Sequence, residues 1–319
     1  MTEMILAPLR GVTMRCFRET FAAEITSAGF TEAFTPFIAA IHGMDPLKDS
    51  ELRGGPVLSG GRVKVTPQFI GKDHAALRSS LEAVKSAGFD TADLNCGCPF
   101  PMVRRKGRGA GIFRTPDVLR RMMEVGCEVM GPGRFSVKVR LGLEKCDELL
   151  SLMPLFNDFP LRFITVHGRV ARQMYEGECD VEAVRRVVAA AKVSVVLNGD
   201  IPFPPKDVRG ASEEGVVGLM IGRAFVRSLG MGADACGFLR RYVEASRKEL
   251  FGDRPVLGRM KELLSYWKDI PQWRRIWPLV KVSSSIDELL AVVDGMRDSP
   301  LGGKTSGIFG IMDARKENT

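Results

Sequence analysis

The stretch Ser194-Val195-Val196-Leu197-Asn198 is apolar at three consecutive positions and then turns polar. A strand with one face in water alternates apolar and polar residues, whereas a strand covered on both faces is apolar throughout. The stretch therefore predicts a strand of a parallel sheet with helices on its faces. The residues Asn198-Gly199-Asp200 have turn character, so the chain leaves the sheet there.

Similar runs recur along the chain with helical patterns between them. One helix is predicted over Asp73–Ala87, before Gly88, and another starts with Thr115 as its cap and Pro116 in its first turn. Repeated strand–helix alternation predicts an α/β fold, a parallel TIM (β/α)8 barrel, with a doubly wound open sheet as the alternative. The eight predicted strands are Met4–Leu9, Thr31–Pro36, Val65–Ile70, Asp90–Asn95, Ser136–Arg140, Phe163–His167, Ser194–Asn198 and Val216–Ile221.

The strand signal ends near Ala224. Helical patterns over Val226–Leu250, Val256–Lys268 and Ser283–Arg297 then predict a small all-helical C-terminal domain. We expect a catalytic barrel over 1–240, a helical domain over 241–305 and a loose, Gly-rich and polar tail over 306–319.

Composition narrows the class of protein. The 319 residues are 45% hydrophobic and 26% charged, with no apolar run long enough to span a membrane, which predicts a soluble globular protein. The first residues lack the basic region of a signal peptide, and the seven cysteines have no framework spacing. We therefore expect a cytoplasmic protein with reduced thiols.

The net charge of +8 and a pI of about 9.2 are compatible with nucleic acid as a partner. Arg104, Arg105, Lys106 and Arg108 lie within five residues of one another. Each of these basic residues taken alone is also compatible with an ordinary solvent-exposed surface. A cluster of four within five residues instead favours a site for an anionic ligand.

Polar residues gather where the predicted strands end, and in a parallel barrel these ends meet around one site. Lys138, between two valines, would be costly to bury without an anionic partner. Gly222-Arg223 at the start of a helix suits a phosphate, while His167 is as compatible with a structural role as with a functional one. The set is Pro8, Gln68, Asn95, Cys98, Lys138, His167, Asn198, Asp200, Gly222 and Arg223.

Two thiols follow the strand Asp90–Asn95, in the turn Cys96-Gly97-Cys98. They are too close together for a usual chelating pair, and the sequence has no second Cys or His cluster that would supply the remaining ligands. No metal is therefore expected. Cys96 is interpreted as a packing residue, and Cys98, before the basic loop, as the thiol that reaches a substrate. The glycines of Gly107–Gly111 follow a basic loop and not a strand, which argues against a dinucleotide-binding loop.

Taken in order, these motifs resemble the tRNA-dihydrouridine synthase family. The matching segments are Ala7-Pro8-Leu9, Gly11-Val12-Thr13, Phe17-Arg18, Asp93–Pro99, Gly107–Gly111, Ser136–Gly142, His167-Gly168-Arg169 with Gln173 and Tyr175, Asn198–Ile201 and Met220–Arg223. The resemblance covers residues 5 to 225. It implies an FMN-binding TIM barrel followed by a helical domain that helps to hold tRNA.

The resemblance also implies roles. NADPH would reduce FMN, hydride would pass to carbon 6 of a uridine flipped out of the tRNA D-arm, and Cys98 would protonate carbon 5 as general acid. The implied FMN contacts are Pro8, Leu9, Gln68, Lys138, His167, Asn198, Gly199, Asp200, Gly222 and Arg223. The implied substrate contacts are Asn95, Arg169, Gln173 and Tyr175, with Arg104, Arg105 and Lys106 on the flanking phosphates. We expect a monomer.

Some positions depart from the family pattern. Met14 stands where Asp is frequent, Val170 where Thr is usual, and Phe100-Pro101 where a basic residue is common. The second thiol and the stretch Met260–Tyr266 resemble the bacterial branch that acts at tRNA position 16. Two alternatives stay open: an FMN barrel oxidoreductase for a small molecule, like dihydroorotate or enoate reductases, and a tRNA-binding module without catalysis.

Overall fold

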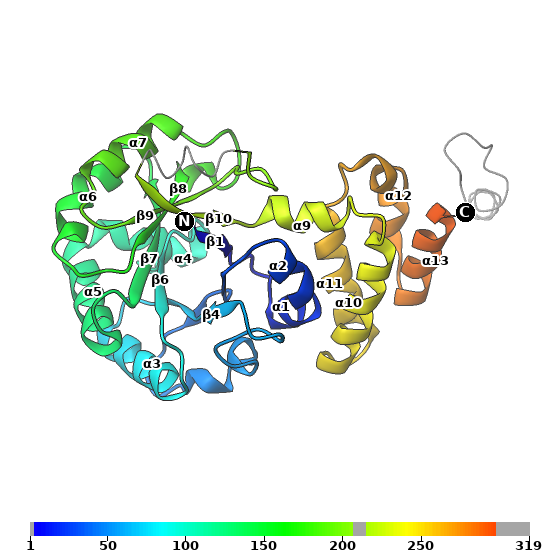
Figure 1. Cartoon of the computed structure of the whole chain (residues 1–319), viewed down its shortest axis with the longest axis horizontal. Coiled ribbons are helices and arrows are strands. Elements are labelled where there is room, and N and C mark those ends of the chain that lie inside the picture. The colour runs from blue at the N-terminus through cyan, green and yellow to red at the C-terminus, as the bar shows by residue number, and fades with distance from the viewer. Residues whose placement is uncertain (1–2, 207–214, 298–319) are drawn as a thin grey trace. The chain divides into compact units, whose positions relative to one another are not determined.

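A ring of parallel strands forms the first part of the chain (Figure 1). The computed structural model describes residues 3–206 and 215–297. The chain divides into two compact units, Met1–Phe225 and Val226–Thr319. The functions predicted for residues 1–240 and 241–305 stay predictions, and the tail predicted over 306–319 lies outside the described residues.

Within the described ranges, the strand order is β3-β5-β6-β7-β8-β9-β10-β1-β2-β4, and every pairing between these strands is parallel. Pro67 alone separates β4 from β5, so these two form one interrupted strand. This strand pairs with β6 through β5 and with β2 through β4, and the ring therefore closes. A proline has no N–H for the ladder, which explains the interruption. The strands are β1 Glu3–Leu6, β2 Glu32–Phe34, β3 Ile38–Ala39, β4 Lys64–Thr66, β5 Gln68–Ile70, β6 Ala92–Cys96, β7 Phe135–Gly142, β8 Ile164–Val170, β9 Val195–Asn198 and β10 Val216–Ile221.

The helices of this unit connect the strands, and Figure 1 shows α3, α5, α6 and α7 outside the ring. The helices are α1 Arg15–Thr20, α2 Ala22–Ser27, α3 His74–Ser86, α4 Pro101–Arg105, α5 Pro116–Met130, α6 Glu148–Asn157 and α7 Val181–Ala190. The predicted barrel is confirmed, and the open sheet is excluded because the ring closes.

Apolar side chains fill part of the interior of the ring. Ile5, Ala7, Phe34, Val196 and Met220 form one buried cluster, which Phe163 completes. Burying a side chain of this size contributes about 1.5–3 kcal/mol, so the cluster is a major source of the barrel's stability. As in barrels generally, the centre is a packed core, and function is left to the strand ends.

Two helix starts test the capping predictions. Asp73 caps α3, because its carboxylate accepts the backbone N–H groups of Ala75 and Ala76. Thr115 does precede α5, but its hydroxyl donates to the Ile112 carbonyl at 3.2 Å and caps no amide of the helix. The prediction of Thr115 as a side-chain cap was therefore wrong, since the preceding turn takes its hydroxyl.

The second unit is helical. Figure 1 shows α10 Ala235–Glu249, α11 Asp253–Ser265, α12 Pro271–Val282 and α13 Ile286–Arg297 within it. Helix α10 packs on α11, and α13 packs on both α11 and α12. Helix α12 was not predicted, because its two prolines and its charges obscure the apolar period.

The single helix predicted over Val226–Leu250 was wrong. The chain forms α9 Arg223–Leu229, breaks, and resumes as α10. Gly230 lies against the Trp267 ring, where an added Cβ would come within 2.5 Å of it. The Gly230 carbonyl accepts hydrogen bonds from the Trp273 indole at 2.8 Å and the Gln272 amide at 3.1 Å. These side chains satisfy the carbonyl that the helix end leaves free.

No helix within residues 3–206 and 215–297 is long and apolar enough to cross a membrane.

Candidate functional site

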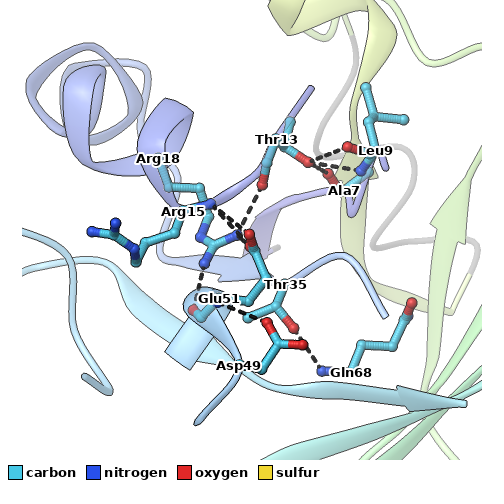
Figure 2. Close-up of polar contacts among 9 residues, drawn as sticks. All are labelled: Ala7, Leu9, Thr13, Arg15, Arg18, Thr35, Asp49, Glu51 and Gln68. Atoms are coloured by element: carbon cyan, nitrogen blue, oxygen red, sulfur yellow. Dashed lines mark hydrogen bonds and ion pairs between the residues drawn. The ribbon is translucent and has the colours of Figure 1, made fainter. Parts of the chain in front are cut away.

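The loop after β1 carries Pro8 and Leu9, both half-buried. The Thr13 hydroxyl accepts the Leu9 backbone N–H at 2.7 Å and donates to the Ala7 carbonyl at 3.0 Å, which closes the loop on itself (Figure 2). Pro8 and Leu9, the predicted cofactor contacts of this loop, are thereby held at the end of the strand.

A buried ion pair fixes Thr13 in turn. Arg18 donates to the Thr13 carbonyl and to a Glu51 carboxylate oxygen, each at 2.8 Å. Glu51 also accepts the backbone N–H of Arg15 at 2.9 Å, as Figure 2 shows. Because both charges of the pair are hydrogen-bonded as well as paired, their burial is tolerated.

The turn that carries Cys98 is organised by one side chain. Asn95, in β6, accepts the backbone N–H of Cys98 at 2.8 Å and that of Gly97 at 3.2 Å through Oδ1. Gly109 lies so close that an added Cβ would be 2.7 Å from the Cβ of Cys98. The Ala110 N–H bonds to the Cys98 carbonyl at 3.1 Å, so the end of the basic loop is packed against the turn that carries Cys98 and hydrogen-bonded to it.

A chain of buried hydrogen bonds runs from this turn into the barrel. The Asn95 Nδ2 group donates to Gln68 Oε1 at 2.8 Å, and the Gln68 Nε2 group donates to Asp93 Oδ2 at 2.8 Å. Ser136 donates to the other Asp93 oxygen at 2.7 Å. The Gln68 backbone N–H bonds to the Thr35 hydroxyl at 3.0 Å (Figure 2). Gln68 is fully buried, so its predicted flavin contact stays a prediction.

Cys98 is 6% exposed, and burial raises the pKa of its thiol. The Phe100 backbone N–H and the charges of Arg140 and Arg10 oppose this rise in the pKa. Cys98 therefore holds its proton at neutral pH, with positive charge beside it. Cys96 is fully buried in β6, and burial raises its pKa well above the ordinary value, in agreement with a packing role.

Arg140 connects the thiol turn to its neighbours. This buried side chain donates from Nε to the Gly97 carbonyl at 3.0 Å and from one terminal nitrogen to the Val170 carbonyl at 3.1 Å. Its guanidinium carbon lies 5.2 Å from the centre of the Tyr175 ring. Burial lowers the pKa of Arg140 to about 10, so it remains charged at neutral pH.

Lys138 lies beside Asn95 across the β6–β7 pairing. Its ammonium donates to Asn198 Oδ1 at 2.7 Å, and Asn198 donates from Nδ2 to the Met220 carbonyl at 2.7 Å. Burial, followed by the charge of Arg140, lowers the pKa of Lys138 to about 7. An anionic ligand in contact would stabilise the charged form.

His167 pairs with Arg140 on one side and Asn198 on the other across the sheet register. Burial, and then the charges of Lys138 and Arg140, lower its pKa well below the ordinary value, so His167 is neutral. Gly199, at φ 106°, lies where an added Cβ would be 2.5 Å from the His167 ring. Only glycine fits this approach without displacing the histidine.

Arg169 is 2% exposed and uses its whole guanidinium inside the protein. It bonds to the Glu176 and Gly177 carbonyls, the Cys179 sulfur, the His167 ring and the Asp200 carboxylate. The structure therefore places this predicted substrate contact beneath the surface, holding the 176–179 loop. A charged side chain with every donor engaged positions its neighbours.

Asp200 connects this buried group to the surface. It takes φ 50°, pairs with Arg169 and accepts from Arg223 at 2.9 Å. Burial acts to raise the pKa of Asp200, but the hydrogen bonds of Arg169 and Cys179, with the charges of Arg169 and Arg223, together lower it below the ordinary value. Gly222 packs against Ala7, where an added Cβ would be 3.0 Å from that residue. The ends of β1, β9 and β10 thus meet here, as predicted.

Tyr175 is 46% exposed, with the guanidinium of Arg140 at 5.2 Å and that of Arg223 at 5.6 Å from its ring centre. Gln173 accepts the Val170 backbone N–H at 2.9 Å and so shapes the turn before Tyr175. Tyr175 is available to a ligand, while Gln173 is partly engaged in the turn.

The basic loop is divided by exposure. Arg105 and Lys106 are exposed, whereas Arg104 is mostly buried and lies 3.8 Å from a Glu144 oxygen. An added Cβ at Gly111 would come within 2.4 Å of the Arg104 carbonyl, so the glycines here permit close packing. Gly109 and Gly111 belong to a short 3-10 helix, Gly109–Arg114, that packs against the thiol turn.

Sequence reasoning missed Asp93, Ser136 and Arg140. They stand two residues from Asn95 and Lys138 on the same strands, and alternate residues of a strand face the same side. Applying the argument used for Lys138, a charge inside an apolar strand, to Asp93 and Arg140 would have found them.

Comparison with known proteins gives a consistent result. The sequence profile described as dihydrouridine synthase (Dus) matches residues 5–231. The chain is 30% identical over 227 residues to tRNA-dihydrouridine synthase B of Escherichia coli K12, covering 70% of this chain and 67% of that protein. It is 28% identical over 222 residues to tRNA-dihydrouridine synthase B of Vibrio cholerae, covering 69% and 67%.

A probable tRNA-dihydrouridine synthase of Rhodobacter capsulatus is 29% identical over 232 residues, with 69% of this chain and 66% of that protein covered. The alignments thus span about two-thirds of each relative's length. The crystal structure of TcOYE with pHBA superposes at a TM-score of 0.52 and 11% identity, over 84% of this chain and 95% of that chain, which shows a shared fold. The profile match covers most of the chain and confirms the resemblance: this protein belongs to the dihydrouridine synthase family of enzymes.

Proposed function

We propose that this enzyme reduces a specific uridine in the D-loop of tRNA to 5,6-dihydrouridine, with FMN as cofactor, NADPH as reductant and Cys98 as the acid. One observation carries the proposal: the Cys98 thiol is kept protonated by burial and is held in a fixed turn beside Arg140. Family membership supports the reaction class, and a flavin cofactor is part of it.

The residues at the strand ends fit FMN. Lys138 and Arg223 supply positive charge, and the lowered pKa of Lys138 shows that its charge lacks full compensation within the protein. The proposed contacts are Pro8, Leu9, Gln68, Lys138, His167, Asn198, Gly199, Asp200, Gly222 and Arg223. Bound there and reduced by NADPH, FMN would supply a hydride for carbon 6 of the uracil ring.

Cys98 completes the addition by giving its proton to carbon 5 of the uracil. A general acid must hold its proton until transfer, and burial ensures this by raising the pKa of the thiol. Once the proton has left, the charges of Arg140 and Arg10 stabilise the thiolate, because they lower the same pKa. The acid is thus protonated at rest and its anion is stabilised after transfer.

The substrate side is formed by Asn95, Gln173 and Tyr175, with Arg169 positioning the 176–179 loop. The exposed Tyr175 ring offers a stacking face to a flipped base. Arg104, Arg105 and Lys106 would contact the flanking phosphates, and the helical domain over 241–305 would hold the rest of the tRNA. We further propose that the protein is cytoplasmic and monomeric. The modified position, proposed as 16, follows only from the resemblance.

Flavin binding is tested by colour. Protein saturated with FMN and then desalted should keep a flavin band at about 450 nm. NADPH should bleach this band, and unmodified tRNA should restore it with formation of dihydrouridine. A protein that takes up no flavin would refute the proposal. Flavin retention with NADPH oxidation but no reaction on tRNA would favour the runner-up, an FMN barrel oxidoreductase for a small molecule.

The basic loop is tested by Arg104→Gln, Arg105→Gln and Lys106→Gln made together. Since Arg104 is mostly buried near Glu144, we expect the two exposed charges to dominate. Binding to tRNA should weaken, and the slope of log K against log salt should become shallower by about 1–2. The matched control is Arg120→Gln with Arg121→Gln on α5, where both residues already pair with acidic neighbours. Equal slopes for wild type and the triple variant would show that this loop is ordinary surface.

A further inference from the structure

Asp93 is a buried carboxyl group that the proposed chemistry does not use. It lies in β6, fully buried, and its two oxygens accept from Gln68 and Ser136. Beyond Gln68 the chain of hydrogen bonds continues to Asn95 and ends at the backbone N–H groups of Gly97 and Cys98. Asp93 is therefore connected to the proposed acid without touching it.

The chemistry of the carboxylate fixes the direction of this chain. An ionised carboxylate has no hydrogen to donate, so Gln68 must turn its Nε2 toward Asp93. The Oε1 atom of Gln68 then faces Asn95, which must donate a hydrogen bond to it from Nδ2. The only group of Asn95 left for the turn is Oδ1, and two N–H groups require an acceptor there.

The reverse direction would be unfavourable. If both amides were rotated, the NH2 group of Asn95 would face the N–H groups of Gly97 and Cys98, leaving buried donors unpaired. The turn has little freedom to avoid this. The Gly97 carbonyl is held by Arg140 at 3.0 Å, and Gly97 packs against the backbone of β7, where an added Cβ would be 3.2 Å from Val139.

We propose that Asp93 is a positioning residue that sets the direction of both amides and thereby holds the Cys98 turn in its working conformation. The functional importance of this turn rests on the proposed function, whereas the hydrogen-bond relay itself does not.

Ser136 has a definite part in the relay. When Asp93 is protonated, the Ser136 hydroxyl can rotate to accept and can donate to the Ala92 carbonyl, which lies 3.5 Å away. The other Asp93 oxygen then still accepts from Gln68. The same rotation would let an asparagine at position 93 keep its oxygen toward Gln68 and its NH2 group toward Ser136. The relay thus depends on an acceptor at position 93 that is directed toward Gln68. Ser136 orients the side chain at position 93, because its hydroxyl can bond to whichever group of that side chain points away from Gln68.

The test is amide hydrogen exchange at Gly97 and Cys98 in the full-length protein without added flavin. Asp93→Asn and Ser136→Ala alone should each leave exchange at these amides within about threefold of wild type. The double variant Asp93→Asn with Ser136→Ala should exchange about tenfold faster than wild type, because no hydroxyl then orients the asparagine and the Gly97 and Cys98 N–H groups alone favour the working direction. Asp93→Leu, which removes the acceptor, should also exchange about tenfold faster.

The Ala183 amide, bonded to Asp180 at 2.8 Å, is the internal reference and should not change in any variant. If the Gly97 and Cys98 amides of the double variant exchanged at the wild-type rate, the proposal would be overturned. It would also be overturned if the rate increase in the double variant were only the product of the increases in the two single variants. Should Asp93→Leu fail to fold, the near-isosteric single and double variants still decide the question. Because the readout needs neither flavin nor tRNA, its failure is distinguishable from failure of the proposed function.

Discussion

Replacing Cys98 with alanine should leave flavin binding and flavin reduction intact and slow transfer to uridine by about 10²–10⁴-fold, the usual contribution of a general acid. The turn should survive, because Asn95 and Ala110 hold it through the backbone N–H and carbonyl of residue 98. Two rates are to be measured in rapid-mixing experiments: bleaching of the flavin by NADPH, and its return on adding unmodified tRNA. Only the second should fall.

Cys96→Ala is the matched control, since that thiol lies two residues away but is fully buried in β6. It should keep both rates and lose only the stability expected for a small cavity, about 1 kcal/mol. A wild-type return rate in Cys98→Ala would show that water or another side chain supplies the proton. A loss of flavin binding in this variant would place Cys98 in the cofactor site instead.

The wild-type protein should lose stability relative to Asp93→Asn as the pH rises from about 4 to about 7. Burial raises the pKa of Asp93 from 3.8 to about 7, so between these values the folded protein holds a proton that the unfolded chain releases. Stability linked to that proton is fully present below the lower pKa and is lost as the pH rises through about 7. Asparagine does not titrate, and the difference between the two proteins should change by at most about 4 kcal/mol.

Urea unfolding of both proteins across this pH range measures the effect. The control is Thr165→Val, a buried change in β8 that removes no ionisable group, and its stability difference from wild type should not depend on pH. A pH-independent difference between wild type and Asp93→Asn would mean that Asp93 has the same pKa folded and unfolded. Such a result would contradict the burial argument.

Much of the barrel could be predicted because consecutive apolar residues and capping residues are local signals. The run Ser194–Asn198 and the cap at Asp73 are examples. The break at Gly230 could not be predicted, because it depends on partners distant in the sequence. The Trp267 ring that requires a glycine at 230 lies 37 positions further along the chain.

The candidate site was predictable where a residue's type was unusual for its position, as for Lys138 between valines. Arg169 shows the limit of that reasoning. Its charge and its place in the motif pointed to a ligand, yet in the structure it is buried and engaged with the 176–179 loop and Asp200. Whether a donor faces a ligand or the protein is decided by the packing of several loops, which no local pattern records.

The burial of Cys98 also has a consequence for the chemical durability of the enzyme. Peroxides and alkylating agents react with the thiolate, not with the thiol. Cys98 is 6% exposed and the pKa of its thiol is raised, so it spends little time in the reactive form. The arrangement that suits Cys98 to deliver a proton therefore also protects it from irreversible oxidation between turnovers.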